Sequence, residues 1–315
     1  MKLSALVIIL AGLSPAAPAW GQAVGHDQSP YVLVLGIAQD GGFPQAGCRK
    51  PCCRDLAADD PRGSGPVCLA IVDPQSDQRW LLECTPDFPR QLADLNQLAP
   101  LEGGPGIDGI LLTHAHIGHY AGLVHLGREV MGADGVPVYA MPRMREFLSG
   151  NGPWSQLVEL GNIELRPLTD GQPVQLNERI RVTPLTVPHR DEFSETVGYR
   201  IDGPRRSVFF LPDIDKWERW ETAIESVVAD VDLAFLDATF FDDQELPGRN
   251  MAEIPHPFVV ETIRRFASRP ADQRARIRLL HFNHSNPVLD PDSPASERLR
   301  RAGLGAARRG DRHDL

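Results

Sequence analysis

Three histidines within six residues are the strongest constraint on what this chain can fold into. His114, His116 and His119 directly follow the apolar segment 109–113, which predicts a buried strand. In the extended backbone after a strand, residues i and i+2 point to the same side, and a residue three positions further closes over the same point as a helix begins. This spacing is what three side chains need in order to share one cation. The sequence therefore predicts a metal site at the end of a strand.

Polar residues end three other predicted strands in the same way. His189, Asp213 and His281 each follow an apolar segment. Side chains at strand ends are held by rigid elements and can converge on one point, which disfavours the alternative of surface or capping histidines. Neutral imidazoles suit zinc, and three protein ligands leave one position for a water molecule. Such a water loses a proton near neutral pH and becomes a nucleophile, and a carboxylate between two histidine groups could bridge two metals.

The order of predicted elements defines the fold class. Strand-rich segments with interspersed helices, and polar residues at strand ends, indicate an α/β (α+β) fold of the αββα type, with two packed mixed β-sheets and helices on the outside. A chain of 315 residues with 42% hydrophobic residues suits one large domain. We expect this domain to span residues 30–290. Residues 291–315 are expected to form a C-terminal helix that fades into a disordered tail.

The N-terminus has the pattern of a signal peptide. Lys2 precedes the apolar run 3–13, and small residues with proline follow, with cleavage predicted after Ala19 or Ala23. We expect residues 1–23 to be removed and the protein to be periplasmic or secreted. The apolar run is shorter than the roughly 20 residues of a membrane span, so no membrane span is expected in the mature chain.

The net charge of −10 argues against a nucleic-acid partner, because phosphate binding needs a concentration of Lys and Arg. The arginines near the C-terminus are interpreted as a solvated helix face and tail. A small-molecule substrate is the expected partner.

The segment Thr-His-Ala-His-Ile-Gly-His that ends at His119 resembles the HxHxDH signature of the metallo-β-lactamase superfamily. His189, Asp213 and His281 follow in the order and context of the later metal ligands of that superfamily. By this resemblance, one metal would be held by His114, His116 and His189. A second would be held by His119 and His281, with Asp213 as the bridge.

One position departs from the signature. The family's aspartate, which ligates the second metal, lies at the position of Gly118. A weaker or vacant second site is the expected result. Asp191, Glu192 and Asp215 follow other ligands closely in the sequence and are candidate substitutes, with the alternative that they are solvated loop residues.

A narrower resemblance points to one branch of the superfamily. The loop GGFPQAGC, the segment 236–243 and the segment HFNHSNP that begins at His281 look like coenzyme PQQ synthesis protein B and the phosphonate-pathway cyclic phosphodiesterases. The resemblance implies a structural zinc held by Cys48, Cys52, Cys53 and His284. A site with three cysteines and one histidine is closed and tetrahedral, so it stabilises a loop without catalysing a reaction. The expected cofactors are one or two Zn²⁺ in the active site and one structural Zn²⁺, with Mn²⁺ or Fe²⁺ as alternatives in the active site.

These features predict a metal-dependent hydrolase that uses a histidine-bound zinc hydroxide on a phosphodiester, lactone or similar ester. Asp213 and His256 are the predicted catalytic residues, and the alternative for His256 is a helix cap. Asp87 and Asp237 are candidates for orienting a ligating histidine, or else turn residues. The rival function is a non-catalytic carrier of a PQQ-related or small anionic ligand.

Overall fold

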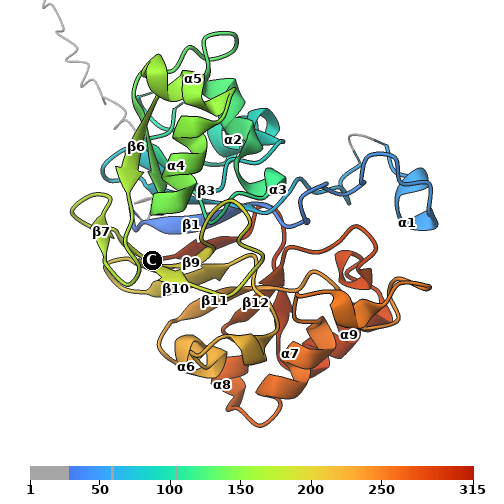
Figure 1. Cartoon of the computed structure of the whole chain (residues 1–315). Helices are drawn as coiled ribbons and strands as arrows, with labels where there is room; N and C mark the ends of the chain where they lie inside the picture. Colours follow the sequence, from blue (N-terminus) through green and yellow to red (C-terminus); the bar gives the residue numbers. More distant parts are fainter. Residues whose placement is uncertain (1–27, 58–59, 104–105) are drawn as a thin grey trace, which may run out of the picture.

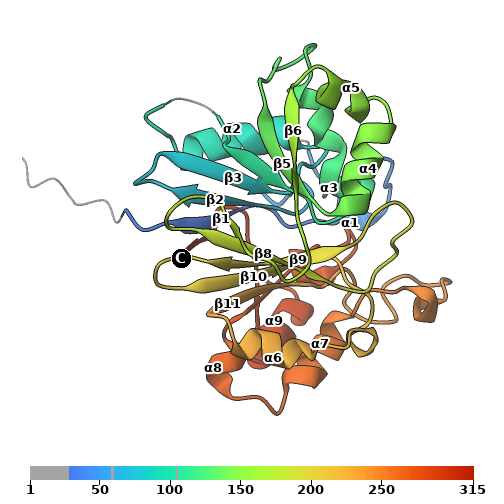
Figure 2. The ribbon, with the colours of Figure 1, turned by 60° about the vertical axis from the view of Figure 1, so that its left-hand side comes forward.

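The computed structural model describes residues 28–57, 60–103 and 106–315. The predicted signal segment 1–23 lies outside these residues. Two seven-stranded sheets form the centre of the described part, and helices cover their outer faces (Figures 1 and 2). The predicted fold class, two packed mixed sheets with helices outside, is confirmed.

The first sheet has the strand order β14-β1-β2-β3-β4-β5-β6. Its strands are β1 (Tyr31–Gly36), β2 (Cys68–Asp73), β3 (Gln78–Leu82), β4 (Gly109–Leu111), β5 (Val136–Ala140), β6 (Ile163–Pro167) and β14 (Arg312–Asp314). Strands β3 to β6 are parallel, and the pairs from β14 to β3 are antiparallel. The carboxyl ends of β3 and β4 therefore lie at the same edge of the sheet.

The second sheet has the strand order β13-β12-β11-β10-β9-β8-β7. Its strands are β7 (Val174–Gln175), β8 (Arg181–Thr186), β9 (Val197–Asp202), β10 (Ser207–Leu211), β11 (Leu233–Asp237), β12 (Ile277–Leu280) and β13 (Gly305–Ala306). Strands β10 to β13 are parallel. The residues that follow β10, β11 and β12 consequently meet at one edge.

The helices form two outer layers. The first sheet is covered by α2 (Phe88–Leu98), α4 (Pro142–Gly150) and α5 (Trp154–Glu159), and the second by α6 (Ile224–Ala229), α7 (Val259–Phe266), α8 (Ala271–Arg274) and α9 (Pro294–Arg301) (Figures 1 and 2). Short helices complete the connections: α1 (Pro51–Arg54), α3 (Ile117–Tyr120), η1 (Ala121–Leu126), η2 (Trp217–Arg219), η3 (Met251–Glu253) and η4 (Pro287–Leu289). Among the residues described, no helix is long and apolar enough to cross a membrane.

Strand β1 shows how the layers are joined. Its six residues are all buried. Val32 and Val34 belong to the core between the sheets, whereas Leu33 and Leu35 pack with the outer helices. Successive strand residues point to opposite faces, so a continuous apolar run fits a strand that is covered on both sides. Each fully buried Val or Leu stabilises the fold by about 1.5–3 kcal/mol.

The prediction of a disordered C-terminal tail is wrong. After α9, β13 joins the second sheet beside β12, and β14 pairs antiparallel with β1 in the first sheet. The side chain of Leu315 is fully buried, and its backbone N–H donates to the carbonyl oxygen of Pro30 at 2.7 Å. Both sheets thus extend beyond residue 290. The tail is ordered because it covers edges that would otherwise expose unpaired backbone groups.

Candidate metal centre

Two of the motif histidines, His114 and His116, lie in the loop between β4 and α3, and the third, His119, lies in α3. The backbone N–H of Cys84 donates to the carbonyl of His119 at 2.8 Å, and that of Gly122 donates to the carbonyl of Cys84 at 2.9 Å. A Cβ atom on Gly122 would lie 2.0 Å from the carbonyl oxygen of Thr85, so only glycine allows this close approach. The motif is therefore fixed against the residues that follow β3.

One group of nitrogens gathers as the sequence predicts. Nε2 of His114 lies 2.9 Å from Nδ1 of His116. His189, which follows β8, brings a third nitrogen, and the three atoms all lie within 4.8 Å of one another. His114 and His189 are buried, and burial lowers the pKa of His114 well below its usual value. Three imidazoles around one point are a suitable ligand set for zinc.

Asp213 lies at the centre of the histidine cluster. Its Oδ2 atom is 2.9 Å from Nε2 of His119, 3.1 Å from Nε2 of His281 and 3.7 Å from Nε2 of His114. Its Oδ1 atom is 3.5 Å from Nε2 of His189. Despite burial, the imidazoles of His281 and His119 hold the pKa of Asp213 well below its usual value. The carboxylate therefore stands between the two histidine groups, where a bridging ligand would have to be.

Buried atoms without hydrogen-bond partners test whether a metal fits this cluster. Among the described residues, several inward-facing atoms have no such partner: Nε2 of His119, His189 and His281, and Oδ2 of Asp213. Buried polar atoms are rarely left unsatisfied, and each such atom costs about 1–3 kcal/mol. A cation that accepts lone pairs from all of them removes this cost. The donor set fits a metal ion.

A buried carboxylate supports two of the motif histidines from outside. Oε1 of Glu83 lies 3.2 Å from Nδ1 of His119, and the hydroxyl of Thr113 donates to it at 2.5 Å. The Thr113 hydroxyl also lies 2.8 Å from Nδ1 of His114. Although burial disfavours the charged imidazole, the carboxylates of Glu83 and Asp213 raise the pKa of His119 well above its usual value. Carboxylates on the outer nitrogen fix the ring orientation of a ligating histidine.

Two of the three candidate substitutes for the missing aspartate occupy outer positions instead. Oδ1 of Asp215 lies 3.3 Å from Nδ1 of His189, and Oε2 of Glu192 lies 3.2 Å from Nε2 of His116. Both contact the ring nitrogen that faces away from the cluster. These acids orient histidines and do not replace the aspartate.

Asp237, at the end of β11, has the predicted orienting position. Its Oδ1 atom accepts a hydrogen bond of 2.7 Å from the hydroxyl of Thr239. The same hydroxyl lies 2.9 Å from Nδ1 of His281, so Asp237 acts on the His281 ring through Thr239. Asp87 does not do so: it precedes α2, and its carboxylate packs toward Gly65.

His256 belongs to the centre and not to a helix cap. Its Nδ1 atom lies 2.8 Å from Oδ2 of Asp237 and 3.5 Å from Oδ1 of Asp213. The residue at the N-cap of α7 is Phe258, and the cap contact is made by the Glu261 carboxylate with the Phe258 N–H. Burial opposes protonation, but Asp237 outweighs it and raises the pKa of His256.

Two residues of the centre have an unusual backbone. His281 has φ of 61° and Glu83 has φ of 83°. Residues other than glycine rarely adopt this left-handed backbone conformation. Those that do concentrate at functional sites, where the surrounding structure compensates for the strain. Both conformations occur where a strand has just ended.

The predicted cysteine site is also assembled. The sulfur atoms of Cys48, Cys52 and Cys53 and a ring nitrogen of His284 all lie within 4.8 Å of one another. The three thiols are free, and Nδ1 of His284 is buried with no hydrogen-bond partner among the described residues. Burial raises the pKa of Cys53 to about 12. Cysteine binds zinc as the thiolate, so a cation in this cluster would displace thiol protons when it binds.

Sequence reasoning missed two acids that the fold brings to the centre. Asp40, in the glycine-rich loop after β1, lies with Oδ1 at 3.3 Å from Nε2 of His119. Glu83 follows β3 directly. The same signal that identified His189 and Asp213, a polar residue just after a buried strand, is present at both positions.

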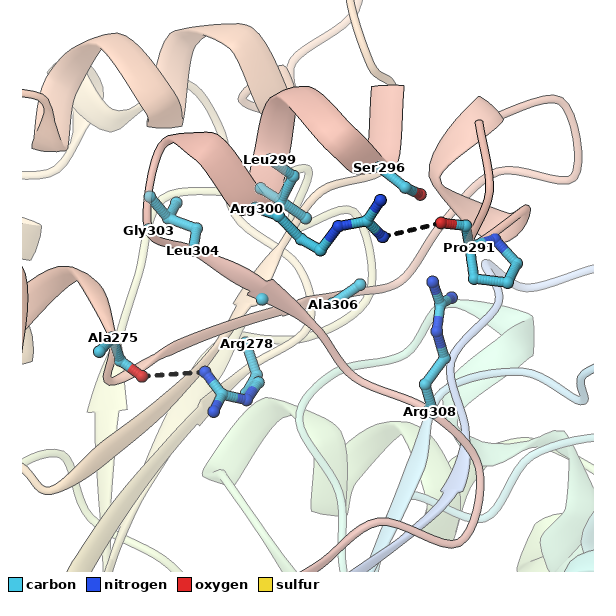
Figure 3. Close-up of a pocket in the computed structure, with 11 residues that line it drawn as sticks. Ala275, Arg278, Pro291, Ser296, Leu299, Arg300, Gly303, Leu304, Ala306 and Arg308 are labelled. Carbon is cyan, nitrogen blue, oxygen red and sulfur yellow. Dashed lines mark hydrogen bonds between the residues drawn. The ribbon is translucent and has the colours of Figure 1, made fainter. Parts of the chain in front are cut away.

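A separate hollow is lined by Arg278 of β12 and by two arginines of the C-terminal segment, Arg300 and Arg308 (Figure 3). Arg300 donates to the carbonyl of Pro291 and Arg278 to that of Ala275, both at 2.9 Å, and Arg308 donates to that of Val288 at 3.2 Å. These bonds fasten the chain around α9, so part of the arginine-rich stretch has a structural role.

The fold and the site together define a metal-binding protein of the αββα sandwich class. Residues 78–282 match the Beta-lactamase superfamily domain, and the chain belongs to this family. Coenzyme PQQ synthesis protein B of Ruegeria pomeroyi is 28% identical over 308 residues, covering 89% of this chain and 98% of that protein.

Two solved structures share the fold over nearly the whole chain. Zinc-bound PqqB from Methylobacterium extorquens has a TM-score of 0.75 and 24% identity, and the match covers 90% of this chain and 100% of that one. A diphosphatase of the PhnP family has a TM-score of 0.65 and 20% identity, with 91% and 97% covered. The resemblance to this branch of the superfamily is confirmed.

Proposed function

We propose that this protein is a metal-dependent hydrolase of an ester-type substrate, such as a phosphodiester or a lactone. The observation that carries the proposal is the convergence of five histidines on Asp213, with buried inward-facing atoms that have no hydrogen-bond partner among the described residues; the five are His114, His119, His189, His256 and His281. Hydrolases predominate in the superfamily, and the fold of a PhnP-family diphosphatase is similar.

The residues have distinct tasks in this proposal. His114, His116 and His189 would hold one metal ion, with Asp213 directed toward the second group. A zinc ion bound there supplies a water activated for attack and polarises the oxygen of the electrophile. His256 lies beside the centre with its position fixed by Asp237, so it can give a proton to the leaving group.

The residues around the histidine centre support a substrate with an apolar part. The loop 190–195 lies over the motif, because the backbone N–H of Ala115 donates to the hydroxyl of Ser194 at 2.8 Å. Ile117 and Phe193 are more than half exposed beside it. The nearby Arg143 is paired with Asp191 at 3.2 Å. Exposed apolar side chains next to paired charges favour a substrate that carries one ester and an apolar group.

Zinc is the metal we propose for both the histidine centre and the cysteine cluster. We also propose that the protein acts in the periplasm or outside the cell, which the signal-peptide pattern around Lys2 supports. The cysteine cluster would hold its ion without catalysing a reaction, since all four positions are filled by protein.

The direct test is hydrolysis by zinc-loaded protein of phosphodiesters, lactones and a multiply charged phosphate ester, each compared with His116→Ala. We expect turnover of an ester with an apolar group and a loss of at least about 100-fold in His116→Ala, the scale of a missing catalytic group. His125→Gln is the matched control, because His125 stacks on Phe88 outside the centre. Full metal occupancy without turnover of any ester would favour the carrier function instead.

A further inference from the structure

The space beside Gly118 is already filled by another side chain. A Cβ atom built on Gly118 would lie 2.1 Å from Oδ1, 2.6 Å from Cα and 2.8 Å from Cβ of Asp40. Real Cβ atoms do not approach other atoms so closely. The space that the Cβ atom of the superfamily's aspartate would need at this position is therefore occupied by Asp40, which comes from a different loop.

Asp40 is directed at the second histidine group. Its Oδ1 atom, His119 and His281 each offer an atom within 4.8 Å of the others. This oxygen is buried and has no hydrogen-bond partner among the described residues, although it lies 3.3 Å from Nε2 of His119. An inward-facing oxygen in this state is what a cation requires as a ligand.

The backbone fixes Asp40 relative to His281. The N–H of Phe282 donates to the carbonyl of Ile37 at 2.9 Å, and the N–H of Gln39 donates to the carbonyl of Phe282 at 2.8 Å. The residues before Asp40 and after His281 thus form one ladder. The chain then turns away at once, with Gly42 at φ of 69°, a conformation that glycine adopts without strain.

We propose that Asp40 is the carboxylate ligand of the second metal ion, in place of the aspartate that the superfamily carries at the position of Gly118. Its partners are His119, His281 and Asp213. Gly118 is then the complement of Asp40, because any side chain there would displace it. The centre would hold two metal ions, contrary to the weak or vacant second site that the sequence predicts. This inference rests on metal binding by the histidine cluster and not on hydrolysis.

The test exchanges the two residues. Zinc content and zinc affinity are measured on the full-length mature chain for the wild type, Asp40→Gly, Gly118→Asp and the double variant Asp40→Gly with Gly118→Asp. Asp40→Gly is expected to lose one zinc per chain and to bind it at least about 100-fold more weakly, since even an outer partner of a ligand changes affinity 10–100-fold. Gly118→Asp alone is expected to lose the same ion, because the new side chain collides with Asp40. The double variant is expected to regain it.

Asp40→Asn provides a second measurement that preserves shape, in case the glycine variant unfolds, and Asp292→Asn is the control for loss of an exposed acid. Wild-type zinc content and affinity in both Asp40 variants would overturn the proposal, as would a double variant that stays deficient while folded. Loss of hydrolysis with both ions retained would count against the proposed function and leave this ligand assignment intact.

Discussion

Glu83 and His119 form the link between the outer and inner parts of the metal centre. Oε1 of Glu83 is 3.2 Å from Nδ1 of His119, whose Nε2 atom is 2.9 Å from Asp213. The Glu83 side chain is fully buried, and burial raises its pKa. Burying a carboxylate costs free energy of folding unless it is paired and hydrogen-bonded. Glu83 meets this requirement through its contact with His119.

Replacing Glu83 by Gln should weaken metal binding without unfolding the chain. The amide keeps the shape but loses the negative charge behind His119, and outer partners of this kind change metal affinity by about 10–100-fold. Zinc titration of the metal-free protein measures the effect. Glu102→Gln, at an exposed position, should bind zinc as the wild type does. Equal affinities in both variants would mean that Glu83 has no part in the centre.

His256→Gln should lower turnover while the metal stays bound. The proposed proton transfer contributes about 10²–10⁴-fold to rate in enzymes that use it. The expected result is a fall in kcat of that order, with zinc content equal to that of the wild type. An unchanged kcat would show that His256 is not the proton donor, and a lost zinc ion would show that it is a ligand.

Cys52→Ser should remove one zinc ion and lower thermal stability. A site that binds only the folded chain stabilises it by about 4 kcal/mol when free zinc is 1,000 times the Kd. Elemental analysis and thermal unfolding with added zinc measure both effects. Cys68→Ala changes a buried thiol outside the cluster, so it should keep the full zinc content. If Cys52→Ser retains every ion, the structural site is misassigned.

Leu315→Ala should destabilise the whole domain. The side chain is fully buried, and its Cβ atom lies against Gly203, where a Cβ on the glycine would be 2.3 Å away. Truncating a buried Leu costs about 2–5 kcal/mol. Urea unfolding should show this loss, whereas Leu98→Ala, half exposed on α2, should lose far less. If the C-terminal tail were disordered, the two variants would lose similar amounts of unfolding free energy.

The histidine centre could be predicted because its signal is local. His114, His116 and His119 are spaced to share a cation, and the other ligand candidates each follow a buried apolar strand. The same rule, applied to every acid in the loop after a strand, would have listed Asp40 as a candidate. It could not have related Asp40 to Gly118, because that relation depends on how the loop after β1 packs over a motif almost 80 positions away.

The C-terminal strands escaped prediction for a different reason. β13 is a two-residue strand of glycine and alanine, and β14 is a three-residue strand of arginine, histidine and aspartate, so no apolar alternation marks either of them. They form because β12 and β1 offer open edges. His256 was similarly ambiguous: proline on both sides suited a cap before a helix, and only the fold places its ring beside Asp237.

The central claim is that zinc in the histidine centre performs ester hydrolysis. The most direct measurement is the hydrolysis rate of metal-free protein during stepwise addition of zinc, with the same titration on His116→Ala. Hydrolysis should rise in proportion to zinc bound at the histidine centre and stay near the background rate throughout in the variant. Hydrolysis that is equal in the two chains, or that persists in the chelated protein, would contradict the account.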